Sequence, residues 1–364
     1  MTRKLIGRLR RKGKSAIKPK TFSLQDFWKN RNKILIVRAV GGLGDILMHR
    51  MLFEDFKKTV PDAQIHFACP QRYHEAVNDH PFIDQILNSD LIDRPELINA
   101  VAENDTETEE ELRSQGFFLR RDYIVSYVTT TICGRTEVGL APLSGPHRSD
   151  IWANHCGVEL KQHSMHITIA ESDKIKAREL IESNRYCDGP TLAFCPISAM
   201  TGKNLDEQQI IKTVQKLKEM GFYVFIIHNG PVLNKTDIPI FSPSSLKVWI
   251  ALINQSNCIV SVDSAAFHCA GGLGKPLVGI FSWADGLVYS KYYKDVTLVQ
   301  KHRLLDPNWT CGPCYNWSNC TLQKNGHRKP CITEITSEMI IKGVEKMINK
   351  CGLLTIFNTY LYAK

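Results

Sequence analysis

Residues 32–58 constrain the fold of this chain more than any other segment, because they join a buried type of strand to a helix through a glycine-rich turn. The strand expected at residues 34–37 is an unbroken apolar run, as in parallel sheets that helices cover on both faces. Three glycines permit a tight turn and the close approach of a ligand: Gly41, Gly42 and Gly44. Asp45 follows them, and two interpretations stay open: a carboxylate at a ligand site or an ordinary helix cap.

The same alternation of apolar runs and helical segments recurs along the chain. In the first half, further strands are expected at 63–69, within 80–88 and at 122–128, and a helix is expected to begin near Ser149. A polar helix is expected at 172–184. In the second half, strands are expected at 191–197, 222–227, 258–263 and 276–282, with helices at 206–220, at 244–256 and from Ser264.

The length and this alternation together predict the architecture. A chain of 364 residues fits two domains of roughly 150 residues each. The predicted fold class is α/β, with two Rossmann-like lobes whose parallel sheets face a central cleft. The predicted boundaries are a basic N-terminal arm at 1–30, an N-terminal lobe at 31–170, a linker at 171–188, a C-terminal lobe at 189–350 and a tail at 351–364. The acidic stretch at 103–111 is expected to form a solvated helix or a flexible insertion.

The net charge of +9 is concentrated at one end of the chain. Residues 1–20 contain nine Lys and Arg and no acidic residue, so the rest of the chain is nearly neutral, and a nucleic-acid partner is not expected. The arm suits either attachment to an anionic membrane surface or a solvated tail. The sequence shows neither a signal peptide's apolar core nor an apolar run of 18 residues. We therefore expect a cytoplasmic protein, in contact with the inner face of the membrane if the arm binds lipid.

Two segments of the second half can bind an anionic ligand. Asp263 lies at a strand end, and the next amides begin a helix, where partial positive charge favours a diphosphate: Ser264, Ala265 and Ala266. His268, one turn further, either reaches the ligand or has a structural role. Lys203 follows the strand at 191–197 and either neutralises a departing phosphate or is an exposed surface lysine.

The 12 cysteines are spread through a long chain, so most are expected to be reduced. Four of them are close together in the sequence: Cys311, Cys314, Cys320 and Cys331. Four thiolates from one loop can hold a structural zinc or iron ion, whereas reduced cysteines and disulfides are the open alternatives.

Several motifs in order resemble one known family. They are KILIVRAVGGLGDIL (33–47), CPISAMTGK (195–203), SVDSAAFHCAGGLGKPLVGIFS (261–282), and CGPCYNW with CITEITSEMIIKGV (311–317 and 331–344). Over most of residues 32–345 the chain resembles the heptosyltransferase family of bacterial glycosyltransferases, which transfer a sugar from a nucleotide diphosphate to lipopolysaccharide core or related acceptors. The resemblance implies a GT-B fold, an acceptor-binding N-terminal lobe, a nucleotide-sugar-binding C-terminal lobe and an inverting single displacement without a catalytic metal.

The resemblance also implies roles for single residues. Asp45 resembles the general base and Lys203 the donor-phosphate lysine. The nucleotide-sugar segment corresponds to Asp263, Ser264, Ala265, Ala266 and His268, and the glycine turn to Gly42 and Gly44; this chain has Ala265 where the family usually has glycine. Related autotransporter heptosyltransferases have an iron site of four cysteines.

The expected function is transfer of a sugar, with ADP-heptose as the leading donor, to a lipopolysaccharide-type glycan, another surface glycan, a glycolipid or a protein. An anionic acceptor could be met by arginines and a histidine, which are otherwise solvated surface residues: Arg120, Arg121, His147 and Arg148. The alternatives are a nucleotide-sugar epimerase on the same fold and a non-catalytic sugar-nucleotide binder.

Overall fold

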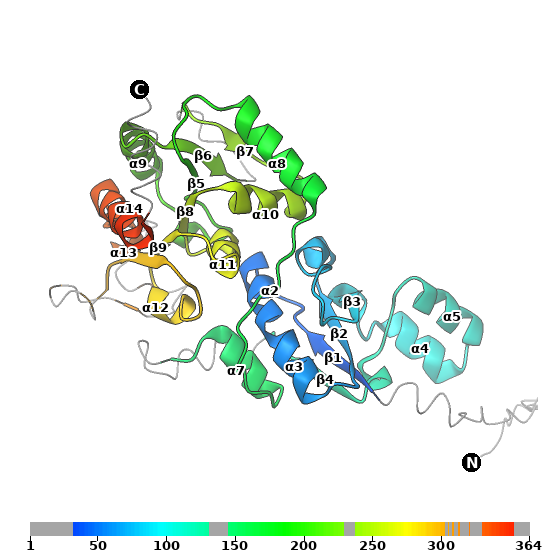
Figure 1. The fold of residues 1–364 in the computed structure, drawn as a ribbon. Helices are drawn as coiled ribbons and strands as arrows, with labels where there is room; N and C mark the ends of the chain where they lie inside the picture. The colour runs from blue at the N-terminus through cyan, green and yellow to red at the C-terminus, as the bar shows by residue number, and fades with distance from the viewer. Residues whose placement is uncertain are drawn as a thin grey trace, which may run out of the picture.

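The computed structural model describes residues 32–130, 145–228, 237–302, 305, 308, 312–313, 320 and 330–352. It has two parallel β-sheets, one in each half of the chain, and Figure 1 shows helices packed around each of them. All strand pairings between the named strands of the described residues are parallel. The predicted α/β class with two parallel sheets is confirmed.

The first sheet has the strand order β3-β2-β1-β4. Its strands are β1 (Lys33–Val37), β2 (Gln64–Cys69), β3 (Gln85–Asn88) and β4 (Val125–Val128). The helices and 3₁₀ turns of this half are α2 (Leu43–His49), η1 (Arg50–Leu52), α3 (Phe53–Thr59), η2 (Gln71–Ala76), η3 (Ser89–Leu91), α4 (Pro95–Glu103), α5 (Thr106–Ser114), η4 (Arg120–Asp122) and α7 (Arg148–His155). The winding reverses between β1 and β4, and in open α/β sheets ligands bind beyond the carboxyl ends of the strands at such a reversal.

The second sheet has the order β10-β9-β8-β5-β6-β7, which is the Rossmann order. Its strands are β5 (Thr191–Cys195), β6 (Tyr223–Ile227), β7 (Ile240–Phe241), β8 (Cys258–Val262), β9 (Leu277–Phe281) and β10 (Val296–Gln300). Its helices are α8 (Glu171–Ser183), η6 (Thr201–Lys203), α9 (Glu207–Glu219), α10 (Leu246–Gln255), α11 (Ala265–Gly272), α12 (Gly286–Tyr289), α13 (Pro330–Thr333) and α14 (Ser337–Cys351). Here the winding reverses between β5 and β8.

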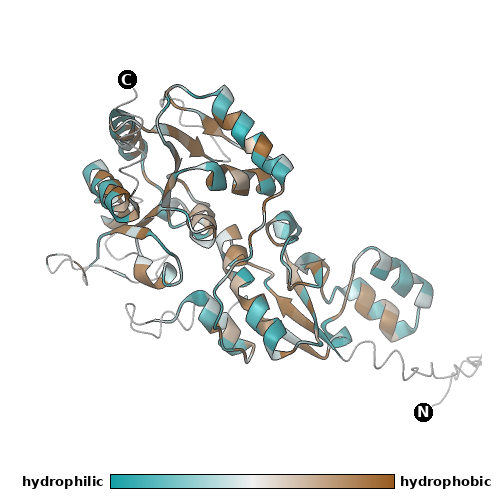
Figure 2. Cartoon of the chain, in the orientation of Figure 1, coloured by the Kyte–Doolittle hydropathy of each residue, from teal (hydrophilic) through white to brown (hydrophobic). Residues whose placement is uncertain are grey.

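The strands form because their apolar runs bury both faces of each sheet. Every residue of β5, β6, β8 and β9 is buried. Figure 2 shows the strands as mostly hydrophobic and the surrounding helices as mixed. Helix α14, for example, buries residues at helical spacing against the second sheet: Ile340, Val344 and Met347.

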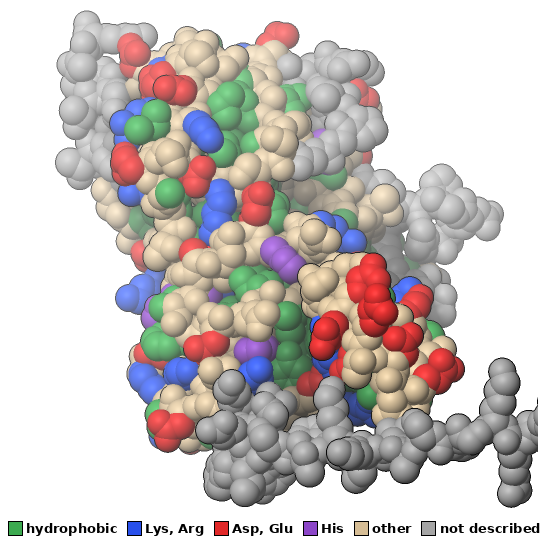
Figure 3. Space-filling view, turned by 90° about the vertical axis from the view of Figure 1, so that its right-hand side faces the viewer, with side chains coloured by type: hydrophobic (Ala, Val, Ile, Leu, Met, Phe, Trp, Pro, Cys, Tyr) green, Lys and Arg blue, Asp and Glu red, His purple; other side chains and the backbone are tan. Residues whose placement is uncertain are grey.

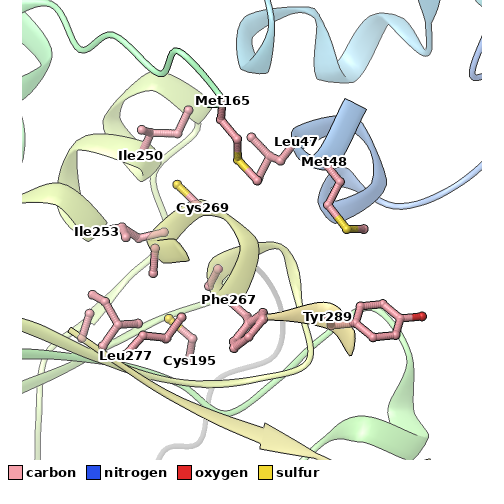
Figure 4. Packing of buried hydrophobic residues seen from close by; sticks show 14 of the residues in the cluster. Leu47, Met48, Met165, Cys195, Ile250, Ile253, Phe267, Cys269, Leu277 and Tyr289 are labelled. Atoms are coloured by element: carbon pink, nitrogen blue, oxygen red, sulfur yellow. The ribbon is translucent and has the colours of Figure 1, made fainter. Parts of the chain in front are cut away.

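One hydrophobic cluster spans both halves of the molecule. It joins Leu47 and Met48 of α2 to Phe267 and Cys269 of α11. In Figure 4, Met165, from the segment that connects the halves, lies between Leu47 of α2 and Ile250 of α10. The two sheets are therefore held by shared apolar packing.

The predicted linker at 171–188 is mostly helical, as the sequence indicated. It contains α8, which packs on α10 of the second half through Ala177 and Ile181. The stretch at 103–111 enters α5, which forms a helical pair with α4 outside the first sheet. Figure 1 shows this pair standing out from the body, and Figure 3 shows acidic side chains on the part that faces the viewer. The expectation of a solvated helix is confirmed.

The second sheet contains one strand that the sequence analysis missed. Strand β10 was not predicted, since its burial alternates along VTLVQ instead of forming an apolar run. Gly271 and Gly272 lie in α11, where an added Cβ would come within 2.3 Å of Tyr293 and of Met165, respectively. These glycines permit close packing. The basic arm and most of the tail lie outside the described residues, and no described helix is long and apolar enough to span a bilayer.

Candidate active site

Asp45 lies in the first turn of α2, just beyond the carboxyl end of β1. Gly42 caps the helix, and its amide donates to Asp45 Oδ2 at 3.1 Å. Gly41 has a φ of +131°, and a Cβ there would come within 2.6 Å of the same oxygen. Only glycine fits this turn without strain. Asp45 therefore helps to fix the helix start from the first turn, while Gly42 is the cap residue. Its carboxylate lies at the switch point of the first sheet, and its role at a ligand site stays a prediction.

Two arginines pair with the Asp45 carboxylate. Arg38 Nη2 lies 3.2 Å from Oδ2, and Arg148 Nη1 lies 2.7 Å from Oδ1. Burial raises the pKa of Asp45, but the charges of Arg148 and Arg38 outweigh it and hold the pKa well below its usual value. Asp45 is ionised at neutral pH. It is also a weak base for as long as both arginines remain in place.

Arg38 is fixed at the reversal point of the first sheet. Its Nη1 donates to the carbonyls of Thr129 at 2.9 Å and Thr130 at 3.2 Å, which follow β4. Its guanidinium lies over the ring of Trp152, 5.1 Å from the centroid. Arg38 therefore joins the ends of β1 and β4 as well as holding Asp45.

The two halves meet where the predicted site residues lie. A Cβ added to Gly44 would come within 2.9 Å of His268 Cδ2 and 3.6 Å of Ala265 Cα, both on α11. Gly44 is thus needed for the close packing of α2 against α11, a role that the sequence analysis did not include. This contact places the helix that carries Asp45 against the helix that follows Asp263.

Lys203 and Asp263 form an ion pair at the switch point of the second sheet. Lys203 follows β5 and Asp263 follows β8, and their Nζ and Oδ2 atoms are 2.6 Å apart. Burial raises the pKa of Asp263, but the charge and hydrogen bond of Lys203 together with smaller contributions outweigh it and hold the pKa below its usual value, so the carboxylate is ionised. Lys203 Nζ also lies 5.4 Å from the centre of the Trp283 ring. The two residues meet because β5 and β8 are neighbouring strands of the sheet.

Helix α11 begins as the sequence indicated. Ser264 is its cap, and its hydroxyl accepts from the Ala266 amide at 3.2 Å. One turn after Ser264, His268 is buried, and its Nδ1 lies 2.9 Å from the hydroxyl of Tyr293. Burial lowers the pKa of His268 to about 4, so the ring is neutral at pH 7. A neutral, fixed ring here is a hydrogen-bonding group rather than a cation.

Helix α7 connects the Asp45 site to the second half. Arg148, its first residue, lies over Tyr289, 5.0 Å from the ring centroid. Asp150 accepts from the Tyr292 hydroxyl at 2.7 Å and from Lys291 Nζ at 3.2 Å. The start of α7 is thus held against residues 289–292 of the other half, with Arg148 on Tyr289 and Asp150 on Lys291 and Tyr292.

The structure brings together most of the predicted site and adds residues that sequence reasoning did not include. Gly44, next to Asp45 in the sequence, lies against Ala265 and His268. His268 Nε2 in turn lies 4.0 Å from Asp263 Oδ1, and Asp263 pairs with Lys203. The additional residues are Arg38, Tyr293 and Trp283, and Arg148, which the sequence suggested only for the acceptor, pairs with Asp45. Arg38 carried a usable signal, because a cation directly after a parallel strand lies at the ligand edge of the sheet. Tyr293 and Trp283 carried none.

The cysteine cluster is only partly described. Cys311 and Cys314 lie outside the described residues. Cys320 is half-buried, and Cys331 is buried at the start of α13. Within the described ranges no group of three or more metal-ligating side chains occurs. The four-cysteine metal site therefore remains a prediction.

This geometry suits reactions in which a proton is removed beside a leaving anion. The Asp45 carboxylate is on the helix that packs against the start of α11, and the Lys203 ammonium group lies beyond the end of β5. The helix amides and Lys203 can stabilise negative charge that develops on a phosphate. Asp45 can accept a proton once its ion pairs weaken.

Comparisons with known proteins agree with this geometry. The family model described as glycosyltransferase family 9 (heptosyltransferase) matches residues 148–309. No curated protein matches the sequence. A solved glycosyl transferase family 9 protein from Veillonella parvula DSM 2008 is 15% identical, with a TM-score of 0.60 over 88% of this chain and 98% of its own.

Two solved structures from E. coli are also similar. The ADP-heptose lipopolysaccharide heptosyltransferase II is 13% identical, with a TM-score of 0.58 over 87% of this chain and 99% of its own. The iron-containing dodecameric glycosyltransferase TibC from strain H10407 is 14% identical, with a TM-score of 0.59 over 88% of this chain and 77% of its own. These structures share the fold with this chain. The predicted resemblance to the heptosyltransferase family is confirmed by the family match, and so is the glycosyltransferase class of enzyme.

Proposed function

We propose that this chain, which is similar to glycosyltransferase family 9 over residues 148–309, transfers a sugar from a nucleotide diphosphate donor to a hydroxyl of an acceptor. One observation carries the proposal: the helix with Asp45 contacts the helix start after Asp263, at the reversal points of the two sheets. In this proposal Asp45 is the base and the start of α11 binds the anion, so the two groups work across one interface. A transfer reaction needs this pairing because its two substrates react between the two halves.

In the proposed reaction Asp45 is the general base. The acceptor oxygen attacks the anomeric carbon and forms the new glycosidic bond, while its proton passes to the Asp45 carboxylate. The bond between the anomeric carbon and the diphosphate oxygen breaks, and the electron pair leaves with the nucleotide diphosphate. A single displacement of this kind inverts the anomeric carbon.

The second half stabilises the leaving group in this proposal. The amides at the start of α11 lie where partial positive charge favours a diphosphate, and Lys203 adds a full charge. Lys203 is paired with Asp263 at rest, so the diphosphate must compete with that carboxylate for the ammonium group. Neutral His268 can donate or accept one hydrogen bond, depending on its tautomer.

ADP-heptose is the donor we propose. Support comes from the similar solved proteins, one described as an ADP-heptose heptosyltransferase and one as the TibC complex with ADP-D-β-D-heptose. The proposed acceptor is an anionic surface glycan, glycolipid or protein, because Arg148 lies beside the base. We also propose that the chain works in the cytoplasm, with the basic arm at residues 1–20 in contact with an anionic membrane face.

A structural metal at Cys311, Cys314, Cys320 and Cys331 is a separate proposal. Thiolates suit zinc or iron, and one similar solved protein is described as iron-containing. The ion would fold the loop and would take no part in sugar transfer. Metal analysis of anaerobically purified protein is expected to find about one zinc or iron ion per chain in the wild type and less in Cys314→Ser. Wild-type protein without bound metal would contradict the site.

A nucleotide-sugar screen tests the proposed function. The wild-type chain is mixed with ADP-, GDP- and UDP-sugars, and melting temperature and nucleotide diphosphate release are measured. A ligand that binds only the folded state raises the apparent stability, so at least one donor should raise the melting temperature. ADP-heptose is expected to give the largest increase and, with an acceptor, free ADP. If no nucleotide sugar changes the melting temperature, the proposed function is wrong.

A further inference from the structure

His268 lies at the junction of the two halves, and its ring atoms face different neighbours. Nδ1 is 2.9 Å from the hydroxyl of Tyr293, and Cδ2 is the atom that an added Cβ on Gly44 of α2 would approach to 2.9 Å. Nε2 faces Asp263, with a distance of 4.0 Å to Oδ1 that is too long for a hydrogen bond. Nδ1 is therefore engaged within the second half, whereas Nε2 is directed toward the Lys203–Asp263 pair.

The Tyr293 ring is held in place by α11. An added Cβ on Gly271 would come within 2.3 Å of this ring, so the glycine provides the space that the ring occupies. Phe267 packs edge-on to the ring, with the two centroids 5.7 Å apart. Within the part of the chain that the structure describes, the Tyr293 hydroxyl has one hydrogen-bond partner, His268 Nδ1. The position of the hydroxyl is thus set by the helix that also contains the histidine.

The protonation of this pair follows from its surroundings. Burial lowers the pKa of His268 to about 4 and raises the pKa of Tyr293 well above its usual value, so at pH 7 the imidazole is neutral and the hydroxyl keeps its proton. A neutral imidazole has one N–H donor and one acceptor nitrogen. Two tautomers therefore remain, one with the hydrogen on Nδ1 and one with the hydrogen on Nε2.

The contacts favour the hydrogen on Nε2. In this tautomer the Tyr293 hydroxyl donates to Nδ1, and the Nε2–H bond faces the negative charge of Asp263. In the other tautomer Nδ1 donates to the hydroxyl, so the hydroxyl proton loses its one acceptor among the described residues, and the Nε2 lone pair faces a carboxylate. That arrangement leaves a donor without a partner and sets two acceptors against each other, which is costly in a buried site.

We propose that Tyr293 is a positioning residue, whose hydroxyl fixes His268 in the tautomer with Nε2–H so that this N–H can donate to an oxygen of the nucleotide-sugar donor. The inference rests on the proposed function and adds how one hydrogen-bond donor of the site is aligned before the substrate arrives. Lys203 and the amides at the start of α11 supply positive charge, and Nε2–H supplies a directed hydrogen bond beside them. Without the Tyr293 hydroxyl the ring also adopts the other tautomer, whose Nε2 lone pair repels an ionised phosphate oxygen.

The ring nitrogens test the assignment without relying on turnover. The full chain is labelled with 15N-histidine, and the His268 signals, assigned with His268→Gln, are followed in two-bond 1H–15N NMR spectra at pH 7 without ligand. The wild type should show a protonated Nε2 and an unprotonated Nδ1. In Tyr293→Phe, which keeps the ring packing and removes only the hydroxyl, this pattern should give way to a mixture of both tautomers. A wild type with the hydrogen on Nδ1, or an unchanged pattern in Tyr293→Phe, would overturn the inference.

A second tyrosine–histidine pair provides the matched control. Tyr123 lies just before β4, at the amino end of the first sheet, and its hydroxyl is 3.0 Å from His66 Nδ1. Tyr123→Phe removes the same kind of contact away from the ligand edge of either sheet, so the His268 pattern and donor turnover should both stay at wild-type values. Unfolding midpoints of both phenylalanine variants show whether the fold is intact. If Tyr123→Phe changed the His268 pattern as much as Tyr293→Phe, a specific role of Tyr293 would be rejected.

Turnover in paired backgrounds separates positioning from a structural role. With ADP-heptose and an acceptor, Tyr293→Phe should lower kcat/KM by about threefold to tenfold, the usual size for one hydrogen bond. The side-chain amide of glutamine offers an N–H without tautomers, so in the His268→Gln background the same change should alter kcat/KM by less than about twofold. An equal loss in both backgrounds would reject the inference, because Tyr293 would then not act through His268.

The two proposals can fail separately. If the wild type neither binds nor consumes a nucleotide sugar but the His268 pattern still requires the Tyr293 hydroxyl, the proposed function is wrong and the tautomer assignment stands. If donor is consumed while the His268 pattern does not depend on Tyr293, the proposed function stands and the positioning role of Tyr293 is wrong.

Discussion

At the scale of single residues, the candidate site is built from charges that restrain each other. Asp45 and Lys203, the two residues expected to do chemistry, are both in ion pairs: Asp45 with Arg38 and Arg148, and Lys203 with Asp263. Each pair keeps a charge in a partly buried place where an isolated charge would be costly. In the proposed reaction the acceptor hydroxyl and the donor diphosphate replace these partners. Without substrates, the ion pairs lower the basicity of Asp45 and engage the Lys203 ammonium group.

Replacement of Asp45 tests the role of the base. Asp45→Asn removes the proton acceptor but keeps the size of the side chain and the hydrogen bond from the Gly42 amide. We expect turnover to fall by roughly 10²–10⁴-fold, because that is the usual contribution of a general base. Turnover with ADP-heptose and nucleotide affinity are measured separately, and the affinity should be retained.

A matched substitution separates this effect from a general loss of fold. Asp188 is an exposed aspartate in the turn before β5, and Asp188→Asn should keep wild-type turnover. Unfolding midpoints of both variants show whether the fold is intact. If Asp45→Asn turns over donor at the wild-type rate, Asp45 is not the base, and a non-catalytic sugar-nucleotide binder becomes the better interpretation of the fold.

At the scale of elements, the contact of α2 with α11 decides how close the two substrates can come. His268 cannot yield easily to a larger residue at position 44, because it is buried and bonded to Tyr293. Gly44→Ala would place a Cβ 2.9 Å from His268 Cδ2. We expect destabilisation of about 1–3 kcal/mol, the usual cost of overpacking, together with slower transfer. Urea unfolding and donor turnover are the measurements.

Gly42→Ala is the geometric control for this change. A Cβ at position 42 meets no atom within 4 Å, and the backbone there is extended, with a φ of −87°. Its unfolding midpoint should therefore remain near that of the wild type. If Gly44→Ala were as stable as Gly42→Ala, the two helices would not be held in contact in solution.

The elements also show what the sequence could predict. Strands such as β5 and β8 were predictable because their apolar runs are buried on both faces. The approach of Asp45 to the helix start at Ser264 followed from the rule that ligands lie beyond the carboxyl ends of parallel strands. The Arg148–Asp45 pair was not predictable, since it joins residues 103 positions apart and depends on how α7 docks. Strand β10 was missed for a different reason: only every second residue of it is buried, so it does not form the fully buried run by which the other strands were recognised.

At the scale of the whole molecule, a buried ionic network fixes the two halves relative to each other. Arg50 is fully buried and pairs with Asp79 at 3.0 Å, while its other nitrogens donate to the carbonyls of Met165 and His166 in the connecting segment. Lys247 of α10 reaches Asp79 from the second half at 2.8 Å. Asp79 therefore joins the first half, the connection and the second half in one place.

Asp79→Asn should weaken this junction. The substitution leaves Arg50 with a neutral partner in a buried site, and removing one member of a buried pair costs about 3–5 kcal/mol. We expect a lower unfolding midpoint, measured by urea titration at pH 7. Glu171→Gln is the matched control: it breaks the exposed i,i+3 pair with Lys174, so it should cost less than about 1 kcal/mol.

The junction also predicts how stability depends on pH. Burial raises the pKa of Asp79, but the bond to Arg50, the charge of Arg50 and the bond to Lys247 hold it well below the usual value. A carboxyl group whose pKa is lower in the folded state stabilises the fold above its unfolded pKa of about 3.9, and this contribution is lost as the pH falls further. The difference in stability between wild type and Asp79→Asn should therefore be constant from pH 5 to 7 and shrink below pH 4. A difference that persists undiminished at pH 2 would show that the Asp79 charge does not hold the two halves together.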